Sequence, residues 1–146
     1  MHTYSSTCEK PKIPKNIKNR VANFENLRSF FSRFPDFFEL PVQLKGLVTP
    51  WLAYPVIIKP SSKIKRQKLQ IFLEKKGIQT RTIFTGNILR QPIMKKRKYR
   101  KVKNAEINSN NVMKNGILIG CHHGLKNKDL EYIKKNFLNF IRRITR

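Results

Sequence analysis

Two arginines and an amide lie close together in the segment 78–92, whose residues predict a strand followed by a polar turn. Arginine presents its N–H donors in a planar fork that matches phosphate and carboxylate oxygens, so Arg81 and Arg90 indicate contact with an anion. The alternatives are a solvent-facing strand position for Arg81 and pairing with a carboxylate or a backbone carbonyl for Arg90. Asn87 either holds the turn through its own side chain, the commoner role, or bonds a ligand hydroxyl.

A second group of chemically active side chains, Cys121, His122 and His123, follows a short apolar strand. Neighbouring side chains of an extended segment point in opposite directions, so these three residues do not form a tetrahedral metal site without further ligands. We therefore expect no metal. For the two histidines the sequence leaves open a structural hydrogen bond or a contact with a ligand hydroxyl or phosphate.

The strand that carries Arg81 is predicted from apolar and polar residues that alternate with a period of two. Gly86 tolerates a positive φ and Pro92 cannot donate a ladder hydrogen bond, so the chain must leave the sheet between them. The residues expected on the buried face are Ile78, Thr80, Thr82 and Phe84.

Three helices are predicted from apolar residues at spacings of three and four. The first covers about 16–34, the second starts after Ser61 or Ser62 and ends at Gly77, and the third starts near Asn127. Their expected core residues are Ile17, Val21, Phe24, Leu27, Phe31 and Phe34; Ile64, Leu69, Phe72 and Leu73; and Leu130, Ile133, Phe137, Phe140, Ile141 and Ile144.

Two further strands, 51–58 and 117–119, complete the predicted sheet, and Pro55 inside the first indicates an edge position or a bulge. The order of elements predicts a small α+β domain with a short, mainly antiparallel sheet and helices on one face. We expect residues 1–18 to form a polar N-terminal segment and residues 19–146 to form the domain.

The chain has 32 basic and 8 acidic residues and a formal net charge of +24, which is typical of a partner of nucleic acid or of an anionic surface. Residues 95–103 are mostly basic. Such a run usually forms a solvated loop and less often an anion-binding site. Tyr99 is the only clear aromatic candidate beside this run, and Lys, Ile and Asn are all abundant. We therefore expect neither a specific nucleic acid nor a membrane as a partner.

Cys8 and Cys121 are too few for a disulfide framework or a zinc site, which fits a reducing cytosol. No apolar run approaches the length of a membrane span, and no apolar signal region follows Met1. The sequence therefore predicts a cytoplasmic protein.

Two segments read in order, 78–92 and 115–124, resemble the C-terminal part of the DegT/DnrJ/EryC1/StrS pyridoxal-phosphate enzymes. They are most similar to the branch that includes the CDP-4-keto-6-deoxyglucose 3-dehydrases of lipopolysaccharide biosynthesis, and the resemblance covers roughly Arg20 to the end. The strings are Ile78-Gln79-Thr80-Arg81 with Phe84-Thr85-Gly86-Asn87-Ile88-Leu89-Arg90-Gln91-Pro92, and Asn115-Gly116-Ile117-Leu118-Ile119-Gly120-Cys121-His122-His123-Gly124.

The resemblance implies the small C-terminal domain of a fold-type-I enzyme, which closes over the active site and, with a second subunit, helps to form a sugar-nucleotide pocket. In the family, pyridoxal phosphate and its catalytic lysine or histidine lie in a large N-terminal domain, and no counterpart precedes Arg20. Pyridoxal phosphate, a nucleotide-linked keto-deoxysugar and a homodimer are thus implied for the family, while we expect no catalytic and no cofactor-binding residue here. The substrate-binding candidates are Arg81, Asn87, Arg90, His122 and His123.

One departure from the family concerns position 110. The family commonly has Asn-Ala-Asp before its Val-Met pair, whereas this chain has Asn at position 110 before Val112 and Met113. The change removes a charge that could order neighbouring arginines, so the sequence leaves the geometry of this loop open.

Three functions fit these observations. The first is a C-terminal fragment of a pyridoxal-phosphate-dependent nucleotide-sugar aminotransferase or 3-dehydrase of lipopolysaccharide deoxysugar biosynthesis, which supplies substrate contacts and is inactive alone. The second is a module that pairs with a paralogue or with a separately encoded cofactor domain. The third is a basic nucleic-acid-binding protein, which would need aromatic residues exposed beside the basic loop.

Overall fold

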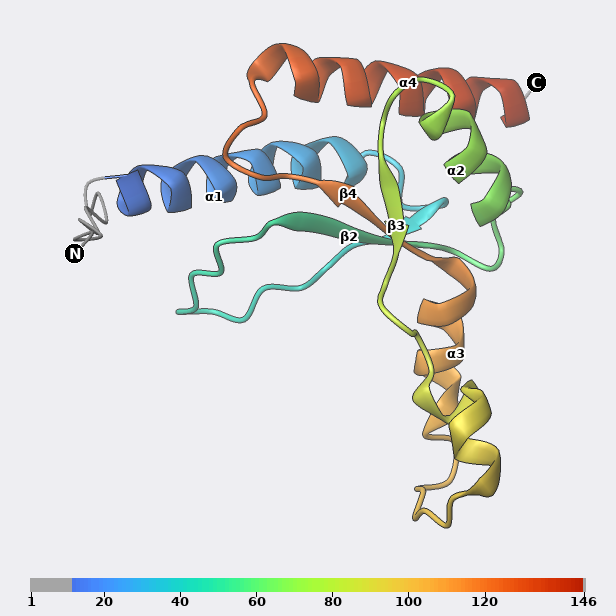
Figure 1. Ribbon diagram of the computed structural model, residues 1–146. Coiled ribbons are helices and arrows are strands. Elements are labelled where there is room, and N and C mark those ends of the chain that lie inside the picture. Colours follow the sequence, from blue (N-terminus) through green and yellow to red (C-terminus); the bar gives the residue numbers. More distant parts are fainter. Residues whose placement is uncertain (1–11, 146) are drawn as a thin grey trace, which may run out of the picture.

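The protein is described by a computed structural model that covers residues 12–145 and shows a body of helices packed on a sheet, with an arm extending from it (Figure 1). The elements, in chain order, are α1 (Lys12–Phe31), β1 (Phe38–Glu39), β2 (Ala53–Ile58), α2 (Arg66–Glu74), β3 (Thr80–Thr82), the 3₁₀ turns η1 (Ile88–Arg90) and η2 (Pro92–Lys96), α3 (Glu106–Asn115), β4 (Gly116–Gly120) and α4 (Asn127–Thr145).

The four strands form one antiparallel sheet in the order β1-β2-β4-β3. Val56 of β2 lies opposite Ile117 of β4, and Thr80 of β3 lies opposite Ile119, so β4 is an interior strand with a partner on each side. Helices α1, α2 and α4 pack on one face of the sheet (Figure 1). The predicted α+β class, the antiparallel sheet and the one-sided helical layer are confirmed.

The core lies between the sheet and these helices and is built largely of aromatic rings. Phe31 is fully buried, with its ring 5.4 Å from Tyr54 in a stacked arrangement and 5.0 Å from Phe137 in an edge contact. The predicted helical stripes are confirmed at the positions that are most buried: Phe24, Leu27, Phe31, Leu69, Leu73, Leu130, Ile133, Phe137, Phe140 and Ile141.

Two helix starts differ from the sequence-based prediction. Helix α1 begins at Lys12, earlier than predicted, because Pro14 falls in the first turn, where its missing N–H would have no helical acceptor. Helix α2 begins only at Arg66 and has no side-chain cap, since the Ser62 hydroxyl instead accepts from the N–H of Ile64 at 3.3 Å. The left-handed Gly77 at its end is confirmed, with φ of +71°.

The strand predicted over 78–84 is shorter in the structure. Thr80 is buried, but Thr82 is exposed and Phe84 is 88% exposed with a positive φ. The alternation fails because β4 pairs with β3 only from Thr80 to Thr82, so the following residues leave the sheet.

Two other strand predictions need correction. The residues from Phe37 to Leu47 were expected to form an irregular connection, but they include β1, a two-residue strand whose Phe38 is buried. Pro55 lies in an interior strand rather than at the edge of the sheet. However, β1 pairs only with Ile57 and Ile58, so at Pro55 only the β4 side of the strand is occupied. The missing N–H of proline is tolerated in such a position.

Residues 83–115 form an arm that connects β3 to β4 and extends away from the body (Figure 1). The sequence predicted a loop here, but the arm contains η1, η2 and the ten-residue helix α3. Helix α3 escaped prediction because it is rich in Asn and has no buried residue, so it carries neither strong propensity nor an apolar stripe.

Cys121, at the end of β4, provides a test of the core. Burial raises the pKa of its thiol to about 12, and burial also raises the pKa of the Tyr54 phenol. The unfolded chain therefore loses these protons first, so their contribution to stability is complete below the ordinary thiol pKa and is lost as the pH rises toward the folded pKa.

We expect the free energy of unfolding to fall by up to about 1.4 kcal/mol per pH unit for the thiol between about pH 9 and about pH 12. Urea titrations across that range should give a smaller slope against pH for Cys121→Ala than for the unaltered protein. Equal slopes would show that the thiol does not titrate differently in the two states.

Candidate functional site

The five candidate residues fall into two groups in the structure. Arg81 and His122 line the same small cavity of about 190 Å³, and His123 follows in the same turn. Asn87 and Arg90 lie instead on the arm, where both contact α3. The sequence grouped Arg81 with Asn87 and Arg90 in the segment 78–92. The fold instead brings Arg81 to the same cavity as His122 and leaves Asn87 and Arg90 on the arm.

The cavity beside Arg81 lies where β3 and β4 run next to the start of β2. Arg81 is exposed and stands opposite Leu118, and Ala53 stands opposite Gly120, so the wall is mostly backbone and aliphatic carbon. An apolar wall with one guanidinium and one imidazole suits a small anionic or hydroxylated group. The remaining lining residues are Leu52, Gln79 and Ile119.

His122 also borders a second cavity of about 380 Å³, which Asp129 and Tyr132 line from α4. Its Nδ1 accepts from the N–H of Gly124 at 3.2 Å, so the neutral ring carries its proton on Nε2. His122 can therefore donate to an oxygen in either cavity.

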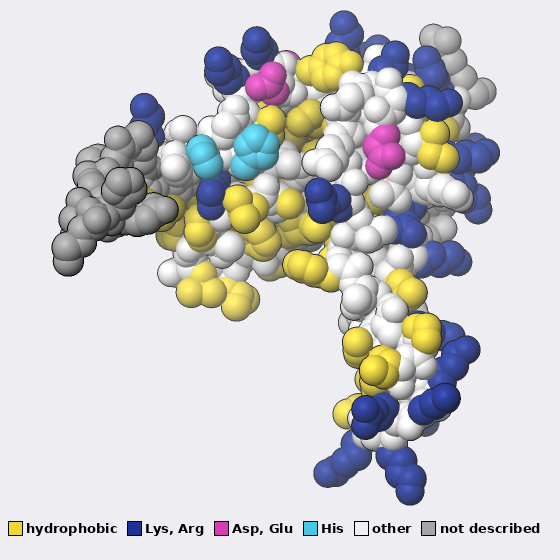
Figure 2. All heavy atoms as spheres, viewed as in Figure 1, with side chains coloured by type: hydrophobic (Ala, Val, Ile, Leu, Met, Phe, Trp, Pro, Cys, Tyr) yellow, Lys and Arg dark blue, Asp and Glu magenta, His cyan; other side chains and the backbone are white. Residues whose placement is uncertain are grey.

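Helix α1 holds the histidine turn in place. The buried Asn23 donates from Nδ2 to the carbonyl of His122 at 2.8 Å, and Arg20 donates from Nε to Nδ1 of His123 at 3.3 Å. Figure 2 shows the two described histidine side chains next to each other on the surface of the body. The sequence did not identify Asn23 and Arg20 as partners of the histidine turn. Asn23 was the one available signal, because it is a polar residue inside a helix that was predicted to pack on the core.

Asn87 holds the turn at the base of the arm. It is 2% exposed, its Oδ1 accepts from the N–H of Leu89 at 2.9 Å, and its Nδ2 donates to Oδ1 of Asn110 at 2.8 Å. Both ends of the amide thus bond within the protein. Next to it, Gly86 has φ of +66°, and a Cβ there would come within 2.3 Å of the Met113 Cβ. The turn is therefore packed directly on α3.

Arg90 is oriented by the same helix. Its Nε donates to Oδ1 of Asn110 at 3.2 Å and lies 3.8 Å from a carboxylate oxygen of Glu106, while its side chain stays 59% exposed. Glu106 lies closer to Lys101, at 2.9 Å, and that hydrogen bond is the main reason why the pKa of Glu106 is lowered. Arg90 is thus positioned from one side and leaves most of its fork open to solvent.

Asn110 lacks the charge of the aspartate common in the family, and the sequence left the geometry of this loop open. In the structure its amide oxygen accepts from both Asn87 and Arg90. A neutral oxygen makes the same two contacts that a carboxylate would make, although each contact is weaker. The geometry of the turn therefore does not depend on the missing charge.

The described residues do not fit pyridoxal phosphate. A lysine that forms an imine at neutral pH must be activated by burial or by a neighbouring cation. Within residues 13–145, however, every lysine side chain is exposed except Lys59 and Lys134, which are half-buried. In the same range, no group of three His, Cys, Asp or Glu side chains comes close enough to hold a metal ion.

None of the helices in the described part of the chain combines sufficient length with sufficient apolar character to cross a membrane.

Residues 10–138 match the DegT/DnrJ/EryC1/StrS aminotransferase family. The chain is 31% identical over 129 residues to the lipopolysaccharide biosynthesis protein RfbH of Salmonella typhimurium, covering 88% of this chain and 29% of that protein. It is also 31% identical over 124 residues to the GDP-4-keto-6-deoxy-D-mannose 3-dehydratase of Escherichia coli, covering 85% of this chain and 31% of that enzyme.

Solved structures agree with these matches. The E. coli GDP-4-keto-6-deoxy-D-mannose-3-dehydratase with bound hydrated PLP superposes with a TM-score of 0.74 at 28% identity, covering 88% of this chain and 32% of that chain. An aminotransferase from Psychrobacter cryohalolentis reaches a TM-score of 0.79 at 10% identity, covering 94% and 37%, and shows the shared fold alone. The chain spans about a third of the length of the relatives it matches.

Proposed function

Because the chain belongs to the DegT/DnrJ/EryC1/StrS aminotransferase family, we propose that it is the C-terminal, substrate-side domain of a nucleotide-sugar aminotransferase or 3-dehydratase that uses pyridoxal phosphate. The sequence assigns residues 19–146 to this domain, and residues 12–18 join them in the proposal because α1 runs from Lys12 to Phe31. Residues 1–11 of the predicted N-terminal segment lie outside the described residues. The observation that carries the proposal is a match to deoxysugar enzymes that extends over most of this chain but only about a third of theirs. The pathway would be the synthesis of a lipopolysaccharide deoxysugar.

In this proposal the chain supplies contacts to the substrate, and a cofactor domain or a second subunit supplies the chemistry. Arg81 and His122 line a cavity suited to an anionic or hydroxylated group, with His123 in the same turn. Arg90 presents an open guanidinium fork on the arm, and Asn87 supports its turn. A nucleotide-linked keto-deoxysugar carries both a diphosphate and hydroxyls, which match these donors.

A partner polypeptide is supported by the hydrophobic surface of the loop between β1 and β2. Aliphatic side chains gathered in one loop and largely open to water are typical of a protein interface. Such a surface would be covered by the cofactor-bearing part of the same enzyme or, in the second candidate function, by a separately encoded cofactor domain. The exposed residues are Val42, Leu44, Leu47, Val48 and Leu52.

The proposal predicts different behaviour for the chain alone and for a chimera. The chain alone should form no stoichiometric, borohydride-reducible adduct with pyridoxal phosphate, because none of its described lysines is buried. When residues 12–146, which keep α1 whole, replace the matched third of the E. coli dehydratase, the chimera should bind the cofactor and turn over the sugar nucleotide. Absorbance spectra and turnover assays provide the two measurements.

A stable adduct at one specific lysine of the isolated chain would contradict the proposed division of roles. A folded chimera that binds pyridoxal phosphate but shows no turnover would contradict the substrate-side role. The parent dehydratase is the positive control for turnover, and a chimera that carries an unrelated small domain is the negative control.

A further inference from the structure

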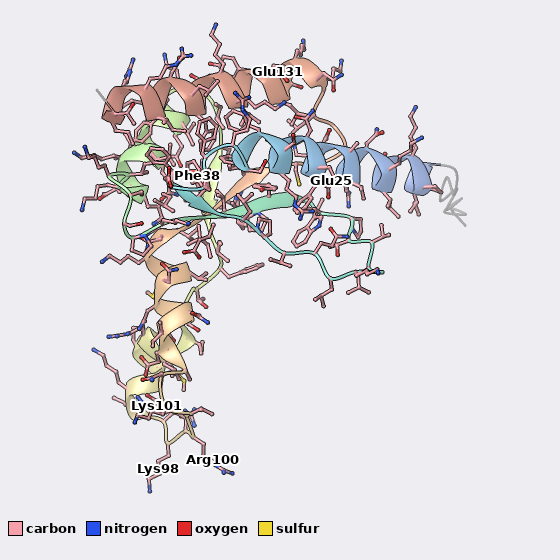
Figure 3. All side chains as sticks on the ribbon, turned by 180° about the vertical axis from the view of Figure 1, so that it is seen from behind. Glu25, Phe38, Lys98, Arg100, Lys101 and Glu131 are labelled. Carbon is pink, nitrogen blue, oxygen red and sulfur yellow. The ribbon has the colours of Figure 1, made fainter. Side chains whose placement is uncertain are left out.

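The tip of the arm, residues 93–107, concentrates positive charge at the point farthest from the body. Figure 3 shows Lys98, Arg100 and Lys101 at the far end of the arm. Between residues 75 and 128 the sequence has one acidic residue, Glu106, and Lys101 already binds it at 2.9 Å. Within the described part of the chain, no ion pair is seen for the other basic residues of the tip: Lys95, Lys96, Arg97, Lys98, Arg100 and Lys103.

The same tip exposes aliphatic side chains. Ile93, Val102 and Ile107 are 64%, 77% and 62% exposed, and none of them has a core to join, since η2 and α3 bury no residue. Figure 2 shows hydrophobic side chains along the arm beside the basic ones. A short segment that combines unpaired cations with open aliphatic groups is an interfacial pattern.

We propose that the arm tip docks on an anionic lipid surface. Basic side chains are attracted to anionic headgroups, and aliphatic side chains beside them can enter the headgroup boundary. This contact is peripheral, because no described helix is suited to span a bilayer. It replaces the expectation drawn from the sequence that no membrane takes part.

The shape of the molecule favours such a surface. An arm that projects from the body brings its cations to a flat layer before the body can collide with it (Figure 1). Binding of single-stranded nucleic acid relies on aromatic rings that stack on bases, and Tyr99, at 44% exposure, is the only aromatic residue of the tip. The aliphatic character of the tip therefore favours lipid over nucleic acid.

The test is co-flotation of the full chain with vesicles of phosphatidylcholine containing about one third phosphatidylglycerol, at physiological salt. The tip variant is Lys96→Gln, Lys98→Gln and Arg100→Gln in one chain. Each cation near an anionic surface contributes roughly fivefold, so the three changes should weaken binding about a hundredfold. Circular dichroism should be unchanged, because all three side chains are exposed.

The matched control removes the same charge from the body through Lys68→Gln, Lys75→Gln and Lys128→Gln, which are also exposed positions. It should change binding by less than about threefold if the contact is local. Equal losses in the two variants would overturn the proposal, because net charge alone would then explain the attraction. Binding to pure phosphatidylcholine as tight as to the anionic vesicles would also overturn it.

A second variant, Val102→Ser with Ile107→Ser, separates lipid from nucleic acid. It should weaken vesicle binding severalfold and leave the binding of a short polyuridine RNA unchanged, because phosphate contacts do not use aliphatic groups. RNA binding that persists at physiological salt, is tighter than vesicle binding and is lost in the tip variant would overturn the proposal in favour of a nucleic acid.

Discussion

Gly86→Ala is expected to separate the base of the arm from α3 and to weaken that contact by about 2–5 kcal/mol. A left-handed backbone costs an L-residue about 1–2 kcal/mol, and overpacking costs about 1–3 kcal/mol more. Both costs apply here, because Gly86 has φ of +66° and an added Cβ would meet both the Cβ and the backbone of Met113. The helix must therefore move or the turn must open.

Hydrogen exchange provides the measurement for this variant. Amides of α3 should lose protection, while those of β2 and β4 keep it, because the core packs on the opposite side of the sheet from the arm. Gly77→Ala is the matched control: its φ is +71°, but its Cβ would meet nothing within 4 Å. Similar losses of α3 protection in the two variants would show that the contact with Met113 does not hold the arm.

Arg90→Ala is expected to raise the Michaelis constant for the sugar nucleotide about 10- to 150-fold in the chimera with the E. coli dehydratase. This range corresponds to the loss of one charged hydrogen bond, about 1.5–3 kcal/mol. The side chain is 59% exposed and is held from one side through Asn110, so its remaining donors are available to a phosphate. Absorbance of the bound cofactor should not change.

Arg97→Ala is the control for a simple loss of charge, because Arg97 is exposed in the same arm and should leave the Michaelis constant within about twofold. Unchanged kinetics for Arg90→Ala together with a lowered melting temperature would assign Arg90 to structure. In that case its bond to Asn110 would be its whole contribution, and the substrate role proposed for it would be wrong.

The parts of the fold that could be predicted are those in which periodicity is strong and burial is complete. The stripes of α1 and α4 gave most of their buried residues correctly, since a helix that packs on a core repeats its apolar residues every three or four positions. The prediction missed the buried Phe30, and the predicted core residues at the ends of the stripes are only half-buried: Ile17, Val21, Phe34 and Ile144. The ends of elements were less predictable. β3 stops at Thr82 because its partner strand stops there, and nothing in residues 78–84 encodes where β4 begins to pair.

The candidate site was predictable as a set of residue types but not as an arrangement. The contact of Asn23 with His122 joins residues 99 positions apart, and the contact of Arg20 with His123 joins residues 103 positions apart. Local spacing carries no information about such pairs. The contact between Arg90 and Asn110, 20 positions apart, was anticipated only as a family feature of position 110. Its geometry was not predictable, because it depends on α3, a helix without an apolar stripe.

The strand order has a consequence for the growing chain during translation. β2 leaves the ribosome before β4, with only the two residues of β1 as a neighbour, and its main partner is β4, whose Ile117 pairs with Val56. Closing a contact between residues so far apart is slow, and the strand has an unpaired edge until it forms. Throughout that interval the nascent segment carries a large excess of positive charge, and mutual repulsion between nascent chains opposes edge-to-edge aggregation.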